Sequence, residues 1–559
     1  MRPESKMVLV ITTTLVHLAV LGSGALFAKW RTEDQVVEEK ELQDAPFRRR
    51  GTKVRRAWGK LARGAKKFKL RRRARQAPHL LTNGDGKDSG CPAGKGGSYS
   101  DYNANINRDS AKIVERRRRT RGVDAKVNML ILMSDTGGGH RASGQALEAA
   151  LEEMYPGKLN VTMVDIWTEH SRWPYSHSVP AYQYAAKNPV VWRAMYEYAR
   201  FPPTRFLNGK MLAFQNFGLF KQAINQYEPD FVVSVHPLCQ DLPLKVLEAM
   251  GPGRRRELPF VTVVTDLGGA HPTWFNPKAD KVFIASDAVM RVAFREGVNL
   301  DKVHQLGLPI RPAFWNNPRP REELRADLGV EDEPPAVMVM GGGDGVGGMG
   351  AIARTLIETL GKELERIVCG KNQIVKRELE EAVWPENVNV MIKGFITNMD
   401  EWMGAVDCLV TKAGPGTIAE ATIRGLPVML SGFLPGQEEG NVPYVIDGGF
   451  GDYSDNPKVI GSTVAKWLKD PKKLMTMKFN ALRVARPKAS YDIAEEIARM
   501  IFVEEAETVA GASGEEGGTA PGVELLGYDL QEVSFPAAGE PEEHVEDSKE
   551  ELPTVSLLG

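Results

Sequence analysis

The hydrophobic residues of the chain fall into short apolar runs that alternate with segments of helical length. These runs lie at 127–133, 159–166, 230–236, 260–267 and 281–286, and then at 336–342, 364–370, 388–394, 408–414 and 427–432. Apolar runs without polar alternation indicate strands buried on both faces, and helix-length segments between them indicate parallel pairing. The pattern therefore predicts two Rossmann-like α/β domains, at 124–318 and 319–503, that face each other across a cleft. The Pro-rich stretch 309–335 connects them.

Both ends of the chain differ in composition from this predicted folded region. Residues 7–28 carry no Lys, Arg, Asp or Glu, which predicts a targeting signal or a membrane anchor within 1–30. The region 31–123 is basic and of low complexity, and we expect a targeting or linker segment there. Its stretch 47–76 has fifteen Lys and Arg and no acid, which fits a transit sequence, a contact with anionic lipid or a solvated arm. Residues 504–559 are acidic and predict a disordered tail.

The formal net charge of zero results from cancellation between these distant segments. Residues 504–552 hold fifteen Asp and Glu against one Lys, opposite the basic stretch near the N-terminus. The four cysteines show no paired spacing, so the sequence suggests neither a disulfide framework nor a zinc site. We expect no metal site and no nucleic-acid partner.

Glycine-rich loops follow the first predicted strand of each domain. The first reads "SDTGGGHRASG" (134–144) and contains Gly138, Gly139 and His140, and the second reads "GGGDGVGG" and contains Gly343. Glycines between a strand and a helix let the backbone present N–H groups at a helix N-terminus, where a phosphate or a developing oxyanion is stabilised. Two such loops on opposite sides of one cleft suggest a phosphorylated ligand.

The nature of that ligand depends on where a ribose-binding carboxylate stands. The "GGGDGVGG" loop fits a dinucleotide-binding pattern, but the next strand ends without the acid which that pattern requires. No segment matches the phosphate loop of nucleotide-hydrolysing motors. In "TKAGPGTIAEA", however, Gly416 and Thr417 open a helix and Glu420 lies on its first turn. A carboxylate there can accept both ribose hydroxyls while the helix N-terminus faces a diphosphate, as expected for a nucleotide-sugar.

These motifs together resemble the monogalactosyldiacylglycerol synthases of plants and algae, in glycosyltransferase family 28. The resemblance rests on "SDTGGGHRASG", "SVHPL", "AHPTWF", "GLPIRP", "VMGGGDGVG", "KGFITNMDEWMGAVDCLVTKAGPGTIAEA" and "GQEEGNVPYV", in one order over 124–503. It implies the two-domain GT-B fold and an inverting transfer of galactose from UDP-galactose to the free hydroxyl of diacylglycerol. The sequence departs from the expected pattern at Gly144 in place of Ala, at Asp344 in place of Glu, and at "GGAHP" (268–272) in place of a more polar stretch.

The resemblance also implies roles for individual residues. Inverting transfer needs a base beside the acceptor hydroxyl, and His140, at a glycine loop and a helix N-terminus, matches the catalytic histidine of the family. On the donor side we expect contacts from Gly343, Phe395, Ile396, Gly416, Thr417, Glu420, Gln437 and Glu438, the last two with the galactose hydroxyls. On the acceptor and lipid side we expect contacts from Gly138, Gly139, Trp173, Pro174, His236 and Trp274.

The same resemblance sets the expectations for cofactors and location. Helix dipoles and backbone donors can stabilise the leaving UDP, so we expect no obligatory cofactor or metal, with activation by anionic membrane lipids. Diacylglycerol stays in the bilayer, and the aromatic and basic stretch 171–203 is the expected docking region. We expect a peripheral protein of the plastid envelope, the alternative being a protein anchored in another membrane through residues 7–28.

Two alternatives to this function remain open at the level of sequence. One is a related family transferase that uses UDP-glucose or another lipid acceptor, and the residues around Gln437 bear on that choice. The other is a non-catalytic lipid-binding adaptor, against which the presence of both His140 and Glu420 speaks. The sequence leaves the oligomeric state open, a homodimer included.

Overall fold

The computed structural model describes most of the region that the sequence predicts to be folded. The described residues are 99–122, 124–252, 256–316, 319–331, 335–341, 349–360, 365–369, 373–384, 390–394 and 396–502. The predicted N-terminal segment 1–30 and the acidic tail 504–559 lie outside them, as do two predicted donor residues, Gly343 and Phe395. Within the described ranges, no helix is both long enough and apolar enough to cross a membrane.

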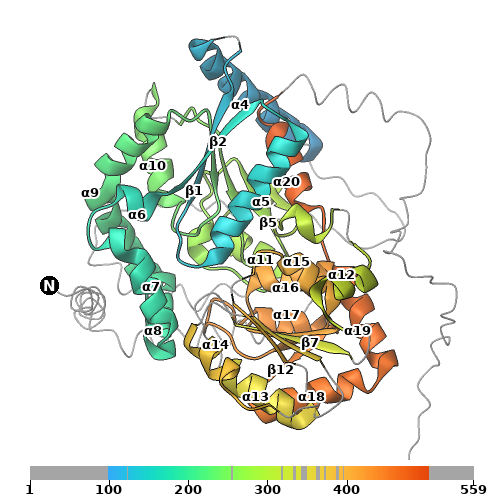
Figure 1. Ribbon diagram of the computed structural model, residues 1–559. Helices are drawn as coiled ribbons and strands as arrows, with labels where there is room; N and C mark the ends of the chain where they lie inside the picture. The colour runs from blue at the N-terminus through green and yellow to red at the C-terminus, as the bar shows by residue number, and fades with distance from the viewer. Residues whose placement is uncertain are drawn as a thin grey trace, which may run out of the picture. The chain divides into compact units, whose positions relative to one another are not determined.

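The first half forms a six-stranded parallel sheet in the order β2-β1-β3-β4-β5-β6 (Figure 1). Its strands are β1 (Val127–Met133), β2 (Leu159–Asp165), β3 (Phe231–Ser234), β4 (Phe260–Val263), β5 (Lys281–Ile284) and β6 (Val303–Gln305). The helices of this half are α5 (Gly138–Met154), α6 (Ile166–His170), α7 (Ser178–Ala186), α8 (Pro189–Arg200), α9 (Pro202–Tyr227), α10 (Asp241–Met250) and α11 (Asp287–Arg295).

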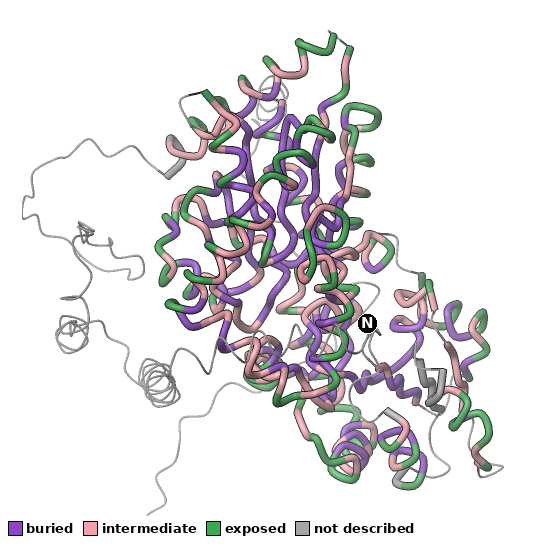
Figure 2. Tube along the Cα trace, turned by 90° about the vertical axis from the view of Figure 1, so that its left-hand side faces the viewer, coloured by how far each residue is buried: buried purple, intermediate pink, exposed green. Residues whose placement is uncertain are grey.

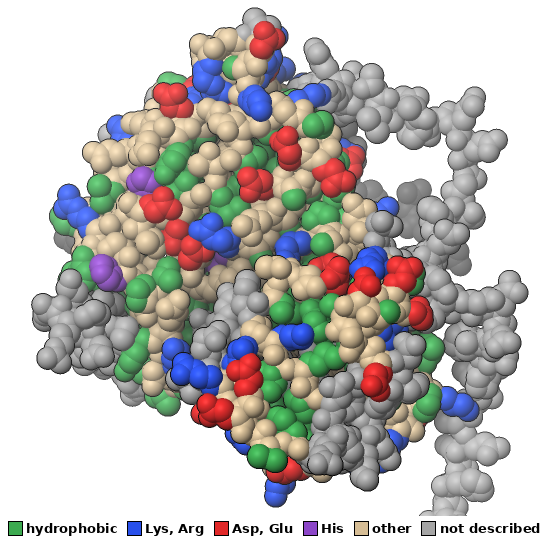
Figure 3. Space-filling view, viewed as in Figure 1, with side chains coloured by type: hydrophobic (Ala, Val, Ile, Leu, Met, Phe, Trp, Pro, Cys, Tyr) green, Lys and Arg blue, Asp and Glu red, His purple; other side chains and the backbone are tan. Residues whose placement is uncertain are grey.

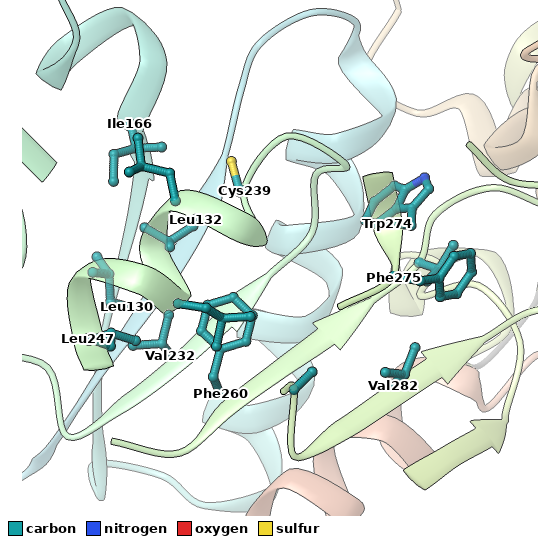
Figure 4. Close-up of a cluster of buried hydrophobic side chains, with 14 of the residues drawn as sticks. Leu130, Leu132, Ile166, Val232, Cys239, Leu247, Phe260, Trp274, Phe275 and Val282 are labelled. Carbon is teal, nitrogen blue, oxygen red and sulfur yellow. The ribbon is translucent and has the colours of Figure 1, made fainter. Parts of the chain in front are cut away.

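Side chains from both faces of this sheet are buried, as the unbroken apolar runs predict. Leu130 and Leu132 of β1 point into one hydrophobic cluster, which Figure 4 shows with Val232, Phe260 and Trp274. The alternate residues Met129, Ile131 and Met133 enter a second cluster on the opposite face. Successive side chains of a strand point to opposite faces, so one apolar run supplies both cores. Figure 2 shows the resulting continuous burial along the strands.

The second half forms another six-stranded parallel sheet, in the order β12-β11-β10-β7-β8-β9. Counted from its own first strand, this is the 3-2-1-4-5-6 order of Rossmann folds. The strands are β7 (Ala336–Met340), β8 (Glu365–Cys369), β9 (Val390–Lys393), β10 (Cys408–Thr411), β11 (Val428–Leu430) and β12 (Gly451–Tyr453). The helices are α12 (Arg321–Leu328), α13 (Met349–Leu360), α14 (Gln373–Glu380), α15 (Met399–Ala405), α16 (Pro415–Ile423), α17 (Asn441–Asp447), α18 (Pro457–Leu468) and α19 (Pro471–Val484).

Each apolar run that predicted a strand contains an observed strand, so the predicted α/β class with two Rossmann-like halves is confirmed. The sequence pattern missed β6 and β12. Both are three-residue strands at sheet edges, and their sequences "VHQ" and "GDY" contain no apolar run.

A helix, α4 (Tyr99–Arg121), lies in the stretch that the sequence predicted to be linker, and that interpretation is wrong for these residues. Its Ala111 and Val114 are buried, and Val114 belongs to the hydrophobic cluster beneath the first sheet. Near its end, Arg121 pairs with the fully buried carboxylate of Asp230. Five arginines in the last six residues masked the helical pattern, because they made the segment resemble a basic arm.

The last helix, α20 (Ala489–Ala498), belongs by sequence to the second predicted domain but packs on the first sheet. Ile493 and Ile497 share a buried cluster with Leu147 of α5, and Lys281 of β5 donates to Glu496 at 2.5 Å. The chain thus passes between the halves a second time. Ser490 Oγ donates to the carbonyl oxygen of Ile310 at 2.7 Å, so the two connections lie side by side.

Charged side chains of the described region are arranged differently from those at the chain ends. Acidic and basic groups are interspersed on the face shown in Figure 3. One cluster is buried: Asp407 accepts from Arg325 at 3.0 Å and also pairs with Arg321 and Lys478. The basic neighbour Arg321 helps to keep the pKa of Asp407 below its usual range despite burial. This network links α12 and α19 to the start of β10.

Candidate active site

The strand order of the first sheet places a candidate site between β1 and β3. The chain leaves β1 for β2 on one side and returns to β3 on the other, and ligands of open α/β sheets bind at such reversals, beyond the strand C-termini. His140 follows β1 on the first turn of α5, and His236 follows β3. Their imidazole ring centroids are 4.5 Å apart in an edge-to-face arrangement.

The loop between β1 and His140 depends on its glycines. Gly137, immediately before α5, has a φ of 146°, a conformation that side-chain-bearing residues rarely adopt. Gly138 and Gly139 are exposed, and a Cβ added to either would meet no atom within 4 Å. These two predicted acceptor residues therefore border open space at the N-terminus of α5, where helical N–H groups have no partner within the helix.

The hydrogen bonds of His140 define its tautomer. Its Nδ1 lies 3.0 Å from the carbonyl oxygen of Val235 and 3.0 Å from Oγ1 of Thr265. A carbonyl oxygen can only accept a hydrogen bond, so Nδ1 carries the proton and Nε2 of the neutral ring holds a lone pair. Nε2 is therefore the atom that can accept a proton from a substrate.

Burial lowers the pKa of His140 to about 4, although the Val235 carbonyl and the charge of Asp135 act in the opposite direction. Removal from water disfavours the charged imidazolium. The lowered pKa keeps the ring neutral, and thus able to act as a base, across the physiological pH range.

This pKa predicts a flat pH dependence on the acidic side. We expect kcat, measured with both substrates saturating, to stay unchanged from pH 8 to pH 6, because His140 remains unprotonated down to about pH 4. A pH–rate profile of the full chain on diacylglycerol vesicles measures this. An acidic limb centred near pH 6.5, the ordinary pKa of histidine, would contradict it.

His236 and Trp274, predicted to line the acceptor side, are both buried. His236 accepts from the backbone N–H of Leu238 at Nδ1 (3.2 Å), so its Nε2 donates to Oγ1 of Thr136 (2.9 Å). Trp274 is fully buried among the hydrophobic residues of Figure 4, and its Nε1 donates to Asp266 at 2.7 Å. Both residues pack around the imidazole of His140. The His236 ring lies against it, and the ring centroid of Trp274 is 6.0 Å from that of His140.

The predicted lipid-contacting residues Trp173 and Pro174 lie apart from the histidines in sequence, between α6 and α7. Trp173 is 43% exposed and Pro174 is half-buried. Part of the Trp173 side chain is thus available for contact outside the protein, and the lipid-contacting role stays a prediction.

The second sheet has its own reversal between β7 and β10, and the predicted donor residues follow β10. Gly416 and Thr417 occupy the first turn of α16, and a Cβ added to Gly416 would meet no atom within 4 Å. Glu420 lies on the second turn of α16, so the prediction that places it on the first turn is wrong. Its Oε1 lies 3.6 Å from a guanidinium nitrogen of Arg311. Burial raises the pKa of Glu420 to about 7, although Arg311 lowers it.

The two predicted sugar-binding residues, Gln437 and Glu438, differ in their burial and in their contacts. Glu438 is buried, where it pairs with Lys412 and accepts from the backbone N–H of Leu434 at 2.9 Å. Gln437 is only half-buried. The carboxylate of Glu438 therefore stabilises its own loop, through its contacts with Lys412 and with the backbone of Leu434. Ile396, another predicted donor residue, packs against the core of the second half.

Comparison with known proteins identifies the family. A family model described as monogalactosyldiacylglycerol (MGDG) synthase matches residues 140–310, and a glycosyltransferase family 28 C-terminal domain matches 336–435. The chain is 40% identical to monogalactosyldiacylglycerol synthase 1, chloroplastic, of Arabidopsis thaliana, over 68% of this chain and 72% of that protein. It is 41% identical to the chloroplastic monogalactosyldiacylglycerol synthase of Spinacia oleracea, over 67% and 72%. The chain belongs to the monogalactosyldiacylglycerol synthase family.

In this MGDG synthase family member, the two halves meet backbone to backbone. Gly268, after β4, donates its N–H to Oδ1 of Asn441 at 2.6 Å, and Asn441 Nδ2 donates to the carbonyl oxygen of Ala413 at 2.8 Å. A Cβ on Gly268 would overlap the carbonyl oxygen of Gly440. Sequence reasoning assigned no role to Asn441, Arg311 or Lys412, because each acts through a partner distant in the chain.

The close approach of Gly268 to the backbone of Gly440 predicts that a larger residue at position 268 destabilises the protein. Gly268→Ala inserts a methyl group into the backbone of Gly440, and overpacking of this kind costs about 1–3 kcal/mol. We expect a lower midpoint of thermal unfolding and slower galactose transfer. The neighbouring Gly269→Ala is the matched control, because its Cβ would meet no atom within 4 Å. Equal behaviour of the two variants would show that the contact between the halves is not required.

Proposed function

We propose that this chain transfers galactose from UDP-galactose to the free hydroxyl of 1,2-diacylglycerol, with inversion at the anomeric carbon. Its membership of the MGDG synthase family makes it a diacylglycerol galactosyltransferase; the UDP-linked donor and the inverting course belong to the proposal. The observation that carries the proposal is the hydrogen bond from Nδ1 of His140 to the Val235 carbonyl, which leaves Nε2 free to accept a proton. His140 lies where the strand order of the first sheet reverses.

In the proposed reaction, Nε2 of His140 accepts the proton of the acceptor hydroxyl as its oxygen attacks the anomeric carbon. The new carbon–oxygen bond forms on the face opposite the bond to the diphosphate, whose electron pair leaves with UDP. A base in this position typically contributes about 10²- to 10⁴-fold in rate. Thr265 and the Val235 carbonyl hold the ring by Nδ1, and the carbonyl stabilises the imidazolium that forms.

On the donor side, we propose that the N-terminus of α16 receives the diphosphate and that Glu420 accepts the ribose hydroxyls. Helix N-termini stabilise anions, and no acid lies in the first turn of α16 to oppose a phosphate. Helices α5 and α16 are in contact, so the proposed base and the proposed diphosphate site sit on adjoining elements. Gln437 is the proposed partner of the galactose hydroxyls. The site as proposed uses no metal ion.

We further propose that α7–α9 and the preceding loop dock on the bilayer that holds diacylglycerol. These elements carry several exposed large apolar side chains: Trp173, Tyr184, Val190, Phe206, Leu207 and Phe214, of which Phe214 is 91% exposed. Lys210 lies 5.5 Å from the centre of the Phe206 ring. Apolar side chains with basic neighbours suit an anionic membrane surface. With relatives named chloroplastic, we propose the plastid envelope as that membrane.

The test uses the full chain with radiolabelled UDP-galactose and, separately, UDP-glucose, on diacylglycerol vesicles with and without anionic phospholipid. We expect galactose transfer that is stimulated by anionic lipid and unaffected by a chelator. Transfer of glucose alone would overturn the donor assignment while leaving a transferase. Absence of transfer from either donor, with UDP still bound in calorimetry, would overturn the proposed reaction.

A further inference from the structure

The loop that contains Gln437 is held by a helix of the other half. We call residues 434–440 the sugar loop. Nε1 of Trp192, on α8, donates to the carbonyl oxygen of Pro435 at 3.1 Å. Leu434 is buried in a small hydrophobic cluster whose other members, Ala185, Ala186 and Trp192, come from α7 and α8. The loop therefore packs on the first half although it belongs by sequence to the second.

The residue before Gln437 is also shaped by α8. Gly436 has a φ of 84°, and a Cβ at this position would lie 2.6 Å from Cδ1 of Tyr196. The loop backbone thus lies directly against the tyrosine ring, in a conformation that favours glycine. Glu439 accepts from the N–H of Gly436 at 3.0 Å and from Arg193 of α8 at 3.4 Å. Contacts with α8 therefore flank Gln437 on both sides.

We propose that Trp192 is a positioning residue for the donor sugar, through which α8 of the acceptor half sets the conformation of the sugar loop. This inference rests on the proposed function, in which Gln437 contacts the galactose. UDP lies against α16 in that proposal, whereas Trp192 contacts the sugar loop through Pro435 and Leu434. Trp192 therefore acts on the binding of the hexose and leaves the binding of the nucleotide unchanged.

The variant Trp192→Phe tests this in the full chain, since it keeps an aromatic ring in the cluster and removes the N–H donor, together with part of the volume of the indole. Loss of one such hydrogen bond corresponds to about a two- to tenfold weakening. We expect the KM for UDP-galactose to rise by this factor, with kcat changed by less than about twofold. The Kd for UDP, measured by calorimetry, stays at the wild-type value.

Trp384→Phe is the matched control, because Trp384 also donates its indole N–H to a backbone carbonyl, that of Leu379, at 3.0 Å. We expect no change in KM from this variant. Arg193→Gln, which removes the ion pair of α8 with Glu439 of the sugar loop, is also expected to raise the KM for UDP-galactose. Thermal unfolding midpoints show whether each variant is folded.

The outcomes separate the inference from the function on which it rests. An unchanged KM in Trp192→Phe, or equal weakening of UDP and UDP-galactose, would overturn the positioning role while wild-type galactose transfer upholds the function. If the wild type binds UDP but transfers no galactose, the proposed function fails, and the role of Trp192 fails with it.

Discussion

Replacing His140 with Ala is expected to lower kcat for galactose transfer by about 10²- to 10⁴-fold, the usual contribution of a general base. The variant loses Nε2, the atom that keeps a lone pair because Nδ1 donates to the Val235 carbonyl. The Kd for UDP should not change, because the proposed nucleotide site lies on α16 in the other half. Initial rates on diacylglycerol vesicles and calorimetry with UDP measure the two quantities.

A second histidine of the same half provides the control. His170 bonds the hydroxyl of Tyr227 through Nε2 at 2.9 Å, and His170→Gln keeps a side chain able to reach that hydroxyl. We expect its kcat to stay within about twofold of wild type, as for most substitutions remote from the reacting atoms. A His140→Ala variant with a similarly small loss would rule out His140 as the base.

The second large effect is expected at Glu420. Glu420→Ala removes the proposed acceptor for the ribose hydroxyls, and hydrogen bonds to charged groups are worth enough to raise the KM for UDP-galactose by about 10- to 100-fold. In the wild type, the pKa of about 7 adds a pH dependence. Glu420 becomes protonated as the pH falls through 7, so KM should rise below that pH, and the rise should disappear in Glu420→Gln.

Steady-state kinetics as a function of UDP-galactose concentration, from pH 6 to pH 8, measure both effects. Glu495→Ala is the control: it breaks an exposed ion pair with Arg499 on α20, away from the donor residues, and should leave KM unchanged. Loss of kcat with an unaltered KM in Glu420→Ala would contradict a role in donor binding.

The fold could be predicted from sequence wherever burial left a continuous apolar run. Strands such as β1 and β10 are buried on both faces, so nearly all of their residues are apolar and form a continuous run in the sequence. The edge strands β6 and β12 have no such apolar run, because one side of each has no strand partner and three residues are too few to form a pattern. The packing of α20 on the first sheet is a long-range contact that local periodicity does not encode.

The sequence predicted where His140 lies in the fold, but it did not predict which of the other candidate residues are buried or paired. The glycine loop and the helix that follows it identified His140, because backbone geometry at a helix N-terminus has a sequence signature. Burial of Trp274 and the pairing of Glu438 with Lys412 have no such signature, since both depend on partners supplied by folding. Arg311, close to Glu420, was missed for the same reason.

The two connections between the halves bear on how the protein can move. Ile310 and Ser490 join them by a hydrogen bond, and the rings of Trp315 and Tyr491 lie 4.9 Å apart beside it. Two covalent crossings that lie side by side should restrict sliding of one half past the other more than bending about the crossings. We therefore expect substrate exchange to proceed by bending about the crossings, which would separate Gly268 from Asn441 and α8 from the sugar loop.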